Sequence, residues 1–400
     1  MRSYPERPSG AGHAVAAGFF GWTLDAFDFF VVVFLYDILA AQFHVSKGAI
    51  IATVGYTLAM RPFGAFLFGL LADRYGRRRP LIANVIFFSV MEVACGFAPN
   101  YLTFAILRTL FGIGMGGEWG IGSSLAMESA PPRWRGILSG MVQSGYSVGF
   151  LLAALASRTI LPQWGWRAMF WAGAVPALLA FYIRLKVPES MAWQQTRTRT
   201  VPFILQALVT HFGTFVYLVL LMTLMMFLSH GTQDLYPDFL KTAHGFSAVT
   251  VANVTIAFNI GAILGAILFG QFSERIGRRR AMGAALALSL AVIPFWAFGS
   301  TLGGLAAGAF FMQVGVQGAW GIIPAHLNEL APASARGLVP GLAYQLGVLC
   351  ASPVNTIEHH LYLRLGYQWA LGSFEIANIL LLALVVALGS ERKGRSFVSL

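Results

Sequence analysis

Two stretches decide the fold of this sequence: residues 69–79, GLLADRYGRRR, and residues 270–280, GQFSERIGRRR. Each contains an acidic residue followed by arginine, then a glycine and three consecutive arginines, and the second lies 201 residues after the first (69 to 270). The same offset aligns further pairs: Trp119 with Trp320, Gly120 with Gly321, Glu128 with Glu329, Arg135 with Arg336, and Gly140 with Gly341. Agreement at one offset over so many positions indicates an internal duplication and predicts two halves of the same architecture.

The composition of the chain is that of a membrane protein. Hydrophobic residues make up 57% of it and charged residues only 11%, whereas about 25% of a soluble domain is charged. Apolar runs of about 20 residues or more, long enough to cross a hydrocarbon core of about 30 Å, recur along the chain. Each run is predicted to be a helix, because lipid offers no hydrogen bonds to the backbone and a helix pairs its own N–H and C=O groups. The predicted spans are 15–41, 48–72, 80–98, 101–127, 136–160, 166–186, 205–236, 247–273, 281–299, 302–328, 337–362 and 366–389.

Duplication and spans together predict an all-α membrane protein with twelve transmembrane helices in two pseudo-symmetric six-helix bundles. We expect the N-terminal half at 1–187, a cytoplasmic linker at 188–202 and the C-terminal half at 203–400. The two cysteines, Cys95 and Cys350, lie inside predicted spans without the spacing of metal ligands or of a disulfide framework. No metal and no cofactor is therefore expected.

The net charge of +11 could suggest a nucleic-acid partner, but the positions of the charges indicate otherwise. Most of the 27 lysines and arginines fall in loops on one side of the predicted spans. The positive-inside rule then places both termini in the cytoplasm and the chain as a multi-pass protein in the cell (inner) membrane. The lipid bilayer, and no nucleic acid, is the expected environment.

The first of the two repeated loops matches a known family pattern. It resembles the loop motif of the major facilitator superfamily, G-x-L-a-D-R-x-G-R-R, over residues 69–78, and the resemblance extends over essentially the whole chain. It implies a gate, in which a carboxylate at a helix end pairs with arginines and neighbouring helix ends in one conformation and releases them in the other. A role in orienting membrane insertion is compatible with this. The expected gating residues are Asp73, Arg74, Arg77, Glu128, Glu274, Arg275, Arg278 and Glu329.

The fourth span contains Arg108 and Glu118 on either side of a glycine-rich stretch. Nucleotide binding is rejected here, because no strand precedes the glycines and they lie within a membrane helix. The pattern instead resembles R-x-x-x-G-x-G-x-G of the superfamily's fourth helix, and no Walker-type GK[ST] occurs in the chain. Transport would then be driven by a gradient. Drug efflux is the least favoured activity, because the stretch 140–149 has glycines but lacks the proline of the antiporter motif.

Ionisable residues within spans are costly, by about 2.5–3.5 kcal/mol at a helix centre, and are functional candidates by default. Arg61 and Arg108 could serve a substrate or could pair structurally with Asp25, Asp28 or Glu118. Glu92 and Glu375 are interpreted as packing or lipid-boundary residues, and His211 as interfacial. The amides Asn259, Gln313 and Gln317 are interpreted as interhelical hydrogen bonders or as lining of a cavity.

Residues 227–237, FLSHGTQDLYP, interrupt an apolar run with a polar stripe at helical spacing. The core Ser229–Asp234 resembles the S-H-x-[ST]-Q-D signature of the sialate/lactate:proton symporter family, and residues 22–30 and 61–64 resemble it as well. Met226 and Asp238 depart from the longer signature of lactate permeases. The short linker has no room for the extra helices of the sialic-acid branch, which favours the carboxylate branch.

The resemblance implies a proton-coupled symporter of a short monocarboxylate such as lactate or pyruvate, acting as a monomer. Arginine would anchor the carboxylate, and a proton on His230 or Asp234, at i and i+4, would change the affinity for an anion. Aromatic acids, di- or tricarboxylates, zwitterions and sialate-like anions are alternative substrates. An intramembrane enzyme and a transport-dead sensor are disfavoured, because no oxyanion site and no output domain is evident. The candidate substrate- and proton-binding residues are Asp25, Asp28, Arg61, Arg108, Glu118, His230, Gln233, Asp234, Asn259 and Gln313.

Overall fold

The computed structural model describes residues 10–196 and 200–397, and over these ranges the chain is helical with no strand. The predicted all-α fold with twelve membrane spans is confirmed. Eight helices in the described ranges are by themselves long and apolar enough to cross a membrane. The ends of the two predicted halves and part of the predicted linker (1–9, 197–199 and 398–400) lie outside the described residues.

The duplication is visible in the boundaries of the helices. Ser46 and Ser247 begin α3 and α12, and each accepts a hydrogen bond at Oγ from the backbone N–H three residues on, at 3.2 Å. α3 and α12 then run for 29 residues each and end at Gly76 and Gly277, whose φ angles are 99° and 100°. Only glycine adopts this backbone region readily, so the repeated glycine terminates the helix in both halves.

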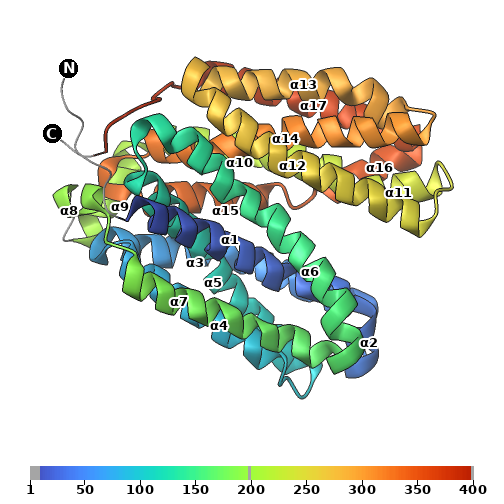
Figure 1. The fold of residues 1–400 in the computed structure, drawn as a ribbon, viewed down its shortest axis with the longest axis horizontal. Coiled ribbons are helices and arrows are strands. Elements are labelled where there is room, and N and C mark those ends of the chain that lie inside the picture. The colour runs from blue at the N-terminus through green and yellow to red at the C-terminus, as the bar shows by residue number, and fades with distance from the viewer. Residues whose placement is uncertain (1–9, 197–199, 398–400) are drawn as a thin grey trace.

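Helices α1 to α7 form one bundle, which lies in the lower part of Figure 1. The first span is interrupted at Leu35 and the fifth and sixth are joined through Gly165, whose φ of 75° turns the chain. The elements are α1 (Ala11–Phe34), α2 (Tyr36–Phe43), α3 (Lys47–Tyr75), α4 (Arg78–Cys95), α5 (Tyr101–Ser129), η1 (Pro132–Trp134), α6 (Arg135–Trp171), η2 (Ala172–Ala174) and α7 (Val175–Lys186), followed by α8 (Met191–Thr196).

Helices α9 to α17 form the second bundle, in the upper part of Figure 1. The predicted span 337–362 is two helices here, because the chain turns at residues 351–353 before Val354 begins the second one. The elements are α9 (Val201–Thr210), α10 (Phe212–Gln233), α11 (Tyr236–Thr242), α12 (Ala248–Ile276), α13 (Arg278–Phe298), α14 (Leu302–Leu330), η3 (Ala333–Ala335), α15 (Val339–Cys350), α16 (Val354–Leu365) and α17 (Tyr367–Leu388).

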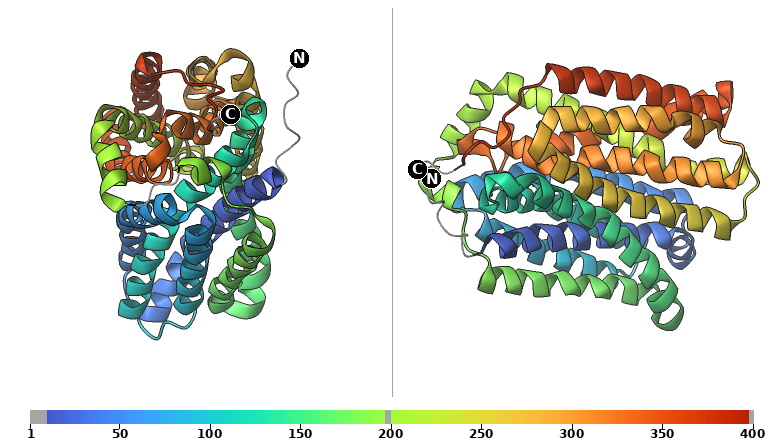
Figure 2. Two further views of the ribbon diagram at one scale, coloured as in Figure 1. Left: turned by 90° about the vertical axis from the view of Figure 1, so that its left-hand side faces the viewer. Right: turned by 45° about the horizontal axis from the view of Figure 1, so that its top comes forward.

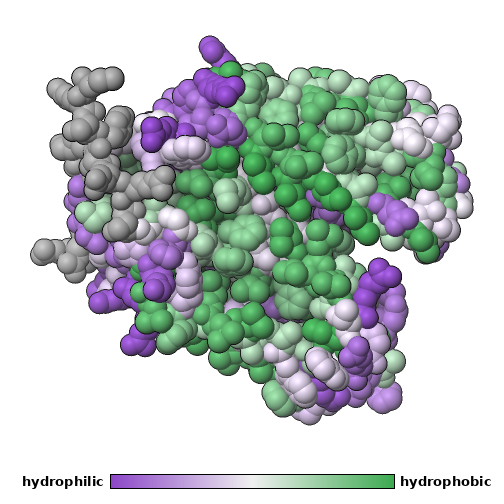
Figure 3. Space-filling model, viewed as in Figure 1, coloured by the Kyte–Doolittle hydropathy of each residue, from purple (hydrophilic) through white to green (hydrophobic). Residues whose placement is uncertain are grey.

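The two bundles meet at one end of the molecule, where α1 begins and the segment after α17 lies; we call it the terminal end (Figure 2). There α6 packs against α12 and α14, and α15 packs against α3 and α5. Small residues permit the approach: a Cβ on Gly120 would lie 2.7 Å from Cα of Gly341. At the opposite end the space-filling surface is notched between the bundles (Figure 3).

We expect Gly76→Ala to lower the melting temperature of the purified protein. An alanine there costs about 1–3 kcal/mol for the unfavourable backbone region, and its Cβ would lie 2.2 Å from Oε2 of Glu189. Gly283→Ala is the matched control, because Gly283 is helical and faces open space. Equal melting temperatures for the two variants in the same detergent would contradict this account of the loop glycine.

Candidate functional site

The terminal end is closed by a carboxylate of the first bundle bound to backbone of the second. Asp73, near the end of α3, accepts hydrogen bonds from the N–H groups of Gly337 at 2.8 Å and Leu338 at 2.9 Å, just before α15 begins. Its Oδ1 also lies 2.5 Å from Nη1 of Arg77. The carboxylate thus supplies the acceptor that the start of a helix needs, across the boundary between the bundles.

Two buried glutamates continue this network symmetrically. Glu128 pairs with Arg77 at 3.0 Å and with Arg336 of the second bundle at 3.3 Å. Glu329 pairs with Arg278 at 3.0 Å and with Arg135 of the first bundle at 3.1 Å. The two sets are related by the sequence offset, so each bundle contributes one glutamate that is bound by an arginine from each side.

The structure gathers six of the eight expected gating residues here: Asp73, Arg77, Glu128, Glu274, Arg278 and Glu329. Glu274 accepts from the N–H of Gly136, as Asp73 does from Gly337. Arg74 and Arg275 are exposed and lie outside the network. Sequence reasoning left out Arg135 and Arg336, although the repeat offset aligns them and could have found them.

Two segments outside the bundles also join the gate. Glu189, after α7, accepts from the N–H groups of Arg77 at 2.8 Å and of Arg78, at the start of α4. The ring of Phe397, after α17, lies 3.9 Å from Cζ of Arg135 and 4.1 Å from Cζ of Arg336. The C-terminal segment therefore contacts arginines of both bundles.

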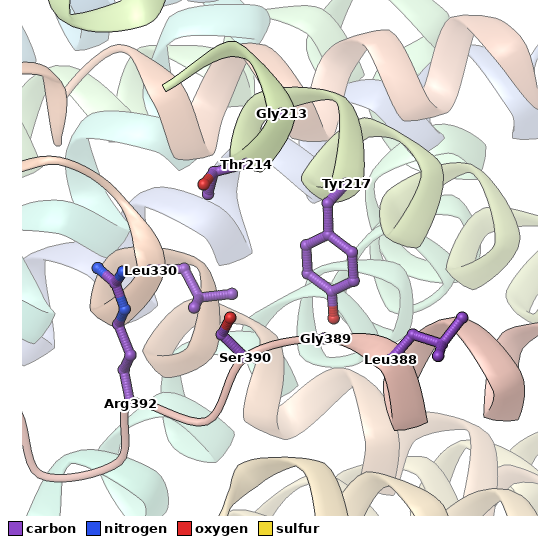
Figure 4. A pocket seen from close by; sticks show the side chains of 8 residues that line it. All are labelled: Gly213, Thr214, Tyr217, Leu330, Leu388, Gly389, Ser390 and Arg392. Atoms are coloured by element: carbon purple, nitrogen blue, oxygen red, sulfur yellow. The ribbon is translucent and has the colours of Figure 1, made fainter. Parts of the chain in front are cut away.

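A pocket of about 230 Å³ opens beside this segment, between the start of α10 and the end of α17 (Figure 4). Its position at the terminal end separates it from every predicted binding residue. Its lining is Gly213, Thr214, Tyr217, Leu330, Leu388, Gly389, Ser390 and Arg392.

Deeper in the first bundle, the predicted ionisable residues form a cluster that is buried from solvent. Arg108 is fully buried and its Nη1 lies 2.6 Å from Oε2 of Glu92, so its partner is none of the three carboxylates considered from sequence. The side-chain oxygens of Asp25, Asp28 and Glu118 have no hydrogen-bond partner in the described part of the chain.

Arg61 is the second positive charge of this cluster. It is 5% exposed, and its Nε and Nη2 atoms have no hydrogen-bond partner within residues 10–196 and 200–397. Its charge acts on Asp25 and on Glu118. Arg61 is therefore a buried cation near two carboxyl groups and hydrogen-bonded to Tyr344, without the close ion pair that Arg108 has.

The polar side chains at the end of α10 are more exposed than that buried cluster, and they are hydrogen-bonded. Nδ1 of His230 lies 3.1 Å from Oδ2 of Asp234, and about a third of each side chain is exposed (38% and 34%). Asn355 of α16 donates to the same Oδ2 at 3.0 Å. Gln233 donates to Oε1 of Gln313 on α14 at 2.8 Å.

The other two amides differ in their surroundings. Nε2 of Gln313 donates onward to Oγ1 of Thr232 at 3.1 Å, so Gln313 belongs to the stripe. Asn259 is 8% exposed and donates to the carbonyl of Thr255 on its own helix. The structure thus brings together His230, Gln233, Asp234 and Gln313, with Asn259 bonded elsewhere.

Aromatic rings from both bundles pack against one another near Arg61. Tyr344 of α15 stacks on Trp119 at 4.2 Å between centroids and meets Trp22 and Trp320 edge-on at 6.0 and 5.7 Å. Trp22 also stacks on Tyr146 of α6 at 5.4 Å. These rings come from both bundles, and sequence reasoning did not select them, although the offset aligns Trp119 with Trp320.

The rings lie well inside the molecule. Trp119 is nine residues before Glu128 on α5, a distance of about 14 Å along a helix. The ion-pair network therefore joins the bundles at one end, the aromatic rings lie deeper, and the partly exposed His230–Asp234 pair lies at the far end of α10.

Comparison with known proteins places this architecture. Residues 14–202 and 205–390 match the family described as "Sugar (and other) transporter". The chain belongs to this family of transporters. A solved structure of the major facilitator superfamily proton:xylose symporter XylE superposes with a TM-score of 0.77 at 20% identity, covering 97% of this chain and 98% of that one.

Two curated relatives of this transporter family are similar in sequence. The carboxylic acid transporter protein homolog of Saccharomyces cerevisiae is 33% identical over 373 residues, which cover 86% of this chain and 60% of the yeast protein. The sialic acid transporter NanX of Escherichia coli is 28% identical over 379 residues, covering 92% of each protein. The chain spans less than two thirds of the length of the yeast relative. The prediction of a multi-pass membrane transporter rather than an enzyme is confirmed.

We expect Glu128→Gln to open the terminal end of this transporter. Removing one partner of a buried ion pair costs about 3–5 kcal/mol, and the part that falls on the closed state alone is the loss of the contact with Arg336 of the second bundle. The probe is a cysteine at Ser124, a buried residue whose Oγ donates to the carbonyl of Arg336, in a Cys350→Ser background. Labelling by a maleimide in detergent should rise by about tenfold or more.

Arg74→Gln is the matched control, because Arg74 is exposed and outside the network. It should leave labelling of the Ser124→Cys probe unchanged. Equal labelling in the Glu128→Gln and Arg74→Gln proteins would show that the glutamate does not hold the gate closed.

Proposed function

We propose that this protein is a secondary active transporter that carries a short monocarboxylate, of the lactate or pyruvate type, together with a proton by alternating access. Two features together carry the proposal. One is the partly exposed His230–Asp234 pair. The other is Arg61, a buried cation whose Nε and Nη2 lack partners in the described chain. A histidine can take up and release a proton, and an arginine attracts an anion. The names of the two curated relatives, a carboxylic acid transporter homolog and a sialic acid transporter, support an organic acid as the substrate class.

Arg61 is the better anchor of the two candidate arginines. Arg108 is already neutralised by Glu92 at 2.6 Å, so an anion at Arg108 would have to displace a buried carboxylate. Arg61 has free donors and the forked geometry that binds a carboxylate with two hydrogen bonds. The carboxyl groups of Asp25 and Glu118, on which its charge acts, would compete with the substrate when ionised and release the arginine when protonated.

That competition supplies the coupling. Protonation of Asp25, Asp28 or Glu118 removes negative charge next to the anchor, and a proton on the His230–Asp234 pair makes the stripe more attractive to an anion. Linkage requires that the bound anion strengthen proton binding by the same factor. Substrate and proton would then cross together.

The two bundles provide the moving parts. In this conformation the gate residues join the bundles at the terminal end, while the surface between them is notched at the other end. By the positive-inside rule the terminal end is cytoplasmic, so the conformation faces outward from the cell membrane. Both bundles belong to one monomeric chain. Their rocking against each other would break the gate and close the opposite end.

Aromatic carboxylates are the second candidate substrate. Trp22, Tyr146 and Tyr344 gather where the bundles meet, and the charge of Arg61 acts on both tyrosines. Such rings would stack on an aromatic acid while the arginine held its carboxylate. Di- and tricarboxylates are less favoured, because Arg108 is committed to Glu92.

We expect Arg61→Gln to lower the affinity for lactate by about 10- to 100-fold, the worth of a hydrogen bond to a charged group. The measurement is KM of labelled lactate uptake into proteoliposomes, with benzoate in parallel for the aromatic alternative. The double variant Glu92→Gln with Arg108→Gln is the control, since it removes the other arginine together with its ion-pair partner. A KM that rises in the control and not in Arg61→Gln would assign the anchor to Arg108.

We expect Asp234→Asn and His230→Ala to abolish the stimulation of uptake by an acid-outside pH gradient. Either change breaks the only titratable pair on the exposed stripe of α10, at 3.1 Å, so that occupancy no longer tracks protonation. Exchange of internal for external substrate, which moves no net proton, should persist. His211→Ala is the control, because this histidine is exposed near the terminal end. Full gradient stimulation in both stripe variants would defeat the coupling proposal.

A further inference from the structure

A second pair of acidic residues lies behind the stripe, in the interior of the second bundle. Glu358 of α16 and Glu375 of α17 are both fully buried, and none of their four carboxyl oxygens has a hydrogen-bond partner in the described residues. They converge on Gly231, the residue after His230. A Cβ on Gly231 would lie 2.1 Å from Oε1 of Glu375 and 3.2 Å from Oε1 of Glu358. Both carboxyl groups therefore lie against the same point of the α10 backbone.

A buried amide beside the pair has an oxygen without a donor among the residues that the structure describes. Asn378 is 6% exposed and lies one turn after Glu375 on α17, within interaction distance of its carboxyl group. Its Nδ2 donates to the carbonyl of Leu224 at 3.3 Å, whereas its Oδ1 has no donor within the described chain. An acceptor without a donor next to a carboxyl group is satisfied when that group carries a proton and donates its O–H.

The charges around the pair do not offer it a cation. Arg108, a buried arginine of the first bundle, is already paired with Glu92 at 2.6 Å. Helix α13 packs on α17, but its arginines lie only at the terminal end. On α10 the facing titratable groups are His230 and Asp234. On α16 the two histidines, His359 and His360, are exposed. Two ionised glutamates would thus repel each other in a place that is buried from solvent, which is costly unless one of them carries a proton.

The pair is connected to the stripe in front of it. Asn355, one turn before Glu358 on α16, donates to Oδ2 of Asp234 at 3.0 Å. The charge of Asp234 acts on Glu358, and that of Glu358 acts on Glu375. A change of charge on Asp234 therefore acts on Glu358 directly and on Glu375 through Glu358.

We propose that Glu358 and Glu375 form a second proton-binding site, an acid–carboxylate pair that holds one proton and is electrostatically coupled to the His230–Asp234 pair. Its part in transport rests on the proposed proton coupling, whereas the bound proton itself does not. The exposed pair exchanges protons with water, and the buried pair responds to its charge. Gly231 is needed because any side chain would displace Glu375.

The proton is tested by infrared difference spectroscopy on the purified full chain, without substrate. The wild type should show the carbonyl stretch of protonated carboxylic acid that shifts in D2O and loses intensity in the double variant Glu358→Gln with Glu375→Gln. Asp37→Asn, at an exposed carboxylate paired with Lys47, is the control and should keep the band. A band of unchanged intensity in the double variant overturns the proposal.

Coupling is tested in the same instrument with Asp234→Asn, which leaves both glutamates in place. Removing the charge of Asp234 should shift or weaken the acid band assigned to the pair. An identical band in Asp234→Asn and wild type overturns the coupling. This variant also keeps the proposal testable if the double glutamine variant does not fold.

Transport separates this inference from the proposed function. Gradient-driven lactate uptake should fall by about tenfold in Glu358→Gln or Glu375→Gln, while substrate exchange stays within about twofold of wild type. Wild-type levels of gradient-driven uptake in both variants overturn the role of the pair in coupling. If the wild type itself is insensitive to the gradient, the proposed function fails, and the infrared result still decides whether the pair binds a proton.

Discussion

The carboxylate of Asp73 bonded to the backbone of Gly337 and Leu338 is the contact on which the observed arrangement of the bundles depends. Its side chain is buried, so water cannot replace the two N–H donors. Leaving a buried charge without its partner costs about 3–5 kcal/mol. The bundles are therefore held in register at the terminal end, because the backbone of the second half supplies two of the donors that this buried carboxylate needs, beside Arg77 of its own half. Glu128 and Glu329 repeat that requirement with arginines.

The duplicated halves have diverged where chemistry is required. At the gate they remain equivalent, because each supplies an acid, an arginine and a glycine at the same offset. Away from the terminal end, the first half buries its ionisable residues and carries both arginines, whereas the second is hydrogen-bonded and partly exposed at His230. A site between unlike halves can hold an anion on one side and a proton on the other, which two identical halves could not do.

The fold was predictable from sequence because its determinants are local or periodic. Apolar length fixes the spans, and Gly76 and Gly277 fix the ends of α3 and α12 through a backbone region that only glycine favours. The meeting of Asp73, Arg77 and their counterparts at the terminal end was largely predictable from a motif and its repeat. The pairing of Arg108 with Glu92 and the meeting of Glu358 with Glu375 were not, since each joins different helices whose relative rotation no spacing within one helix reveals. Tyr344 was missed for the same reason: it matters through rings on α1, α5 and α14.

A gate built from buried ion pairs also explains how it can open. The charges that bind Glu128 come from both bundles, and Arg77 stays with it when the bundles separate, because both belong to the first half. Opening therefore exchanges the contacts with Arg336 and with the backbone of the second bundle for water, without leaving any glutamate unpaired. Because each acid keeps an arginine in either state, the two conformations can differ by little in free energy. A small difference is what the proposed mechanism needs, because the binding of one anion and one proton would then decide between them.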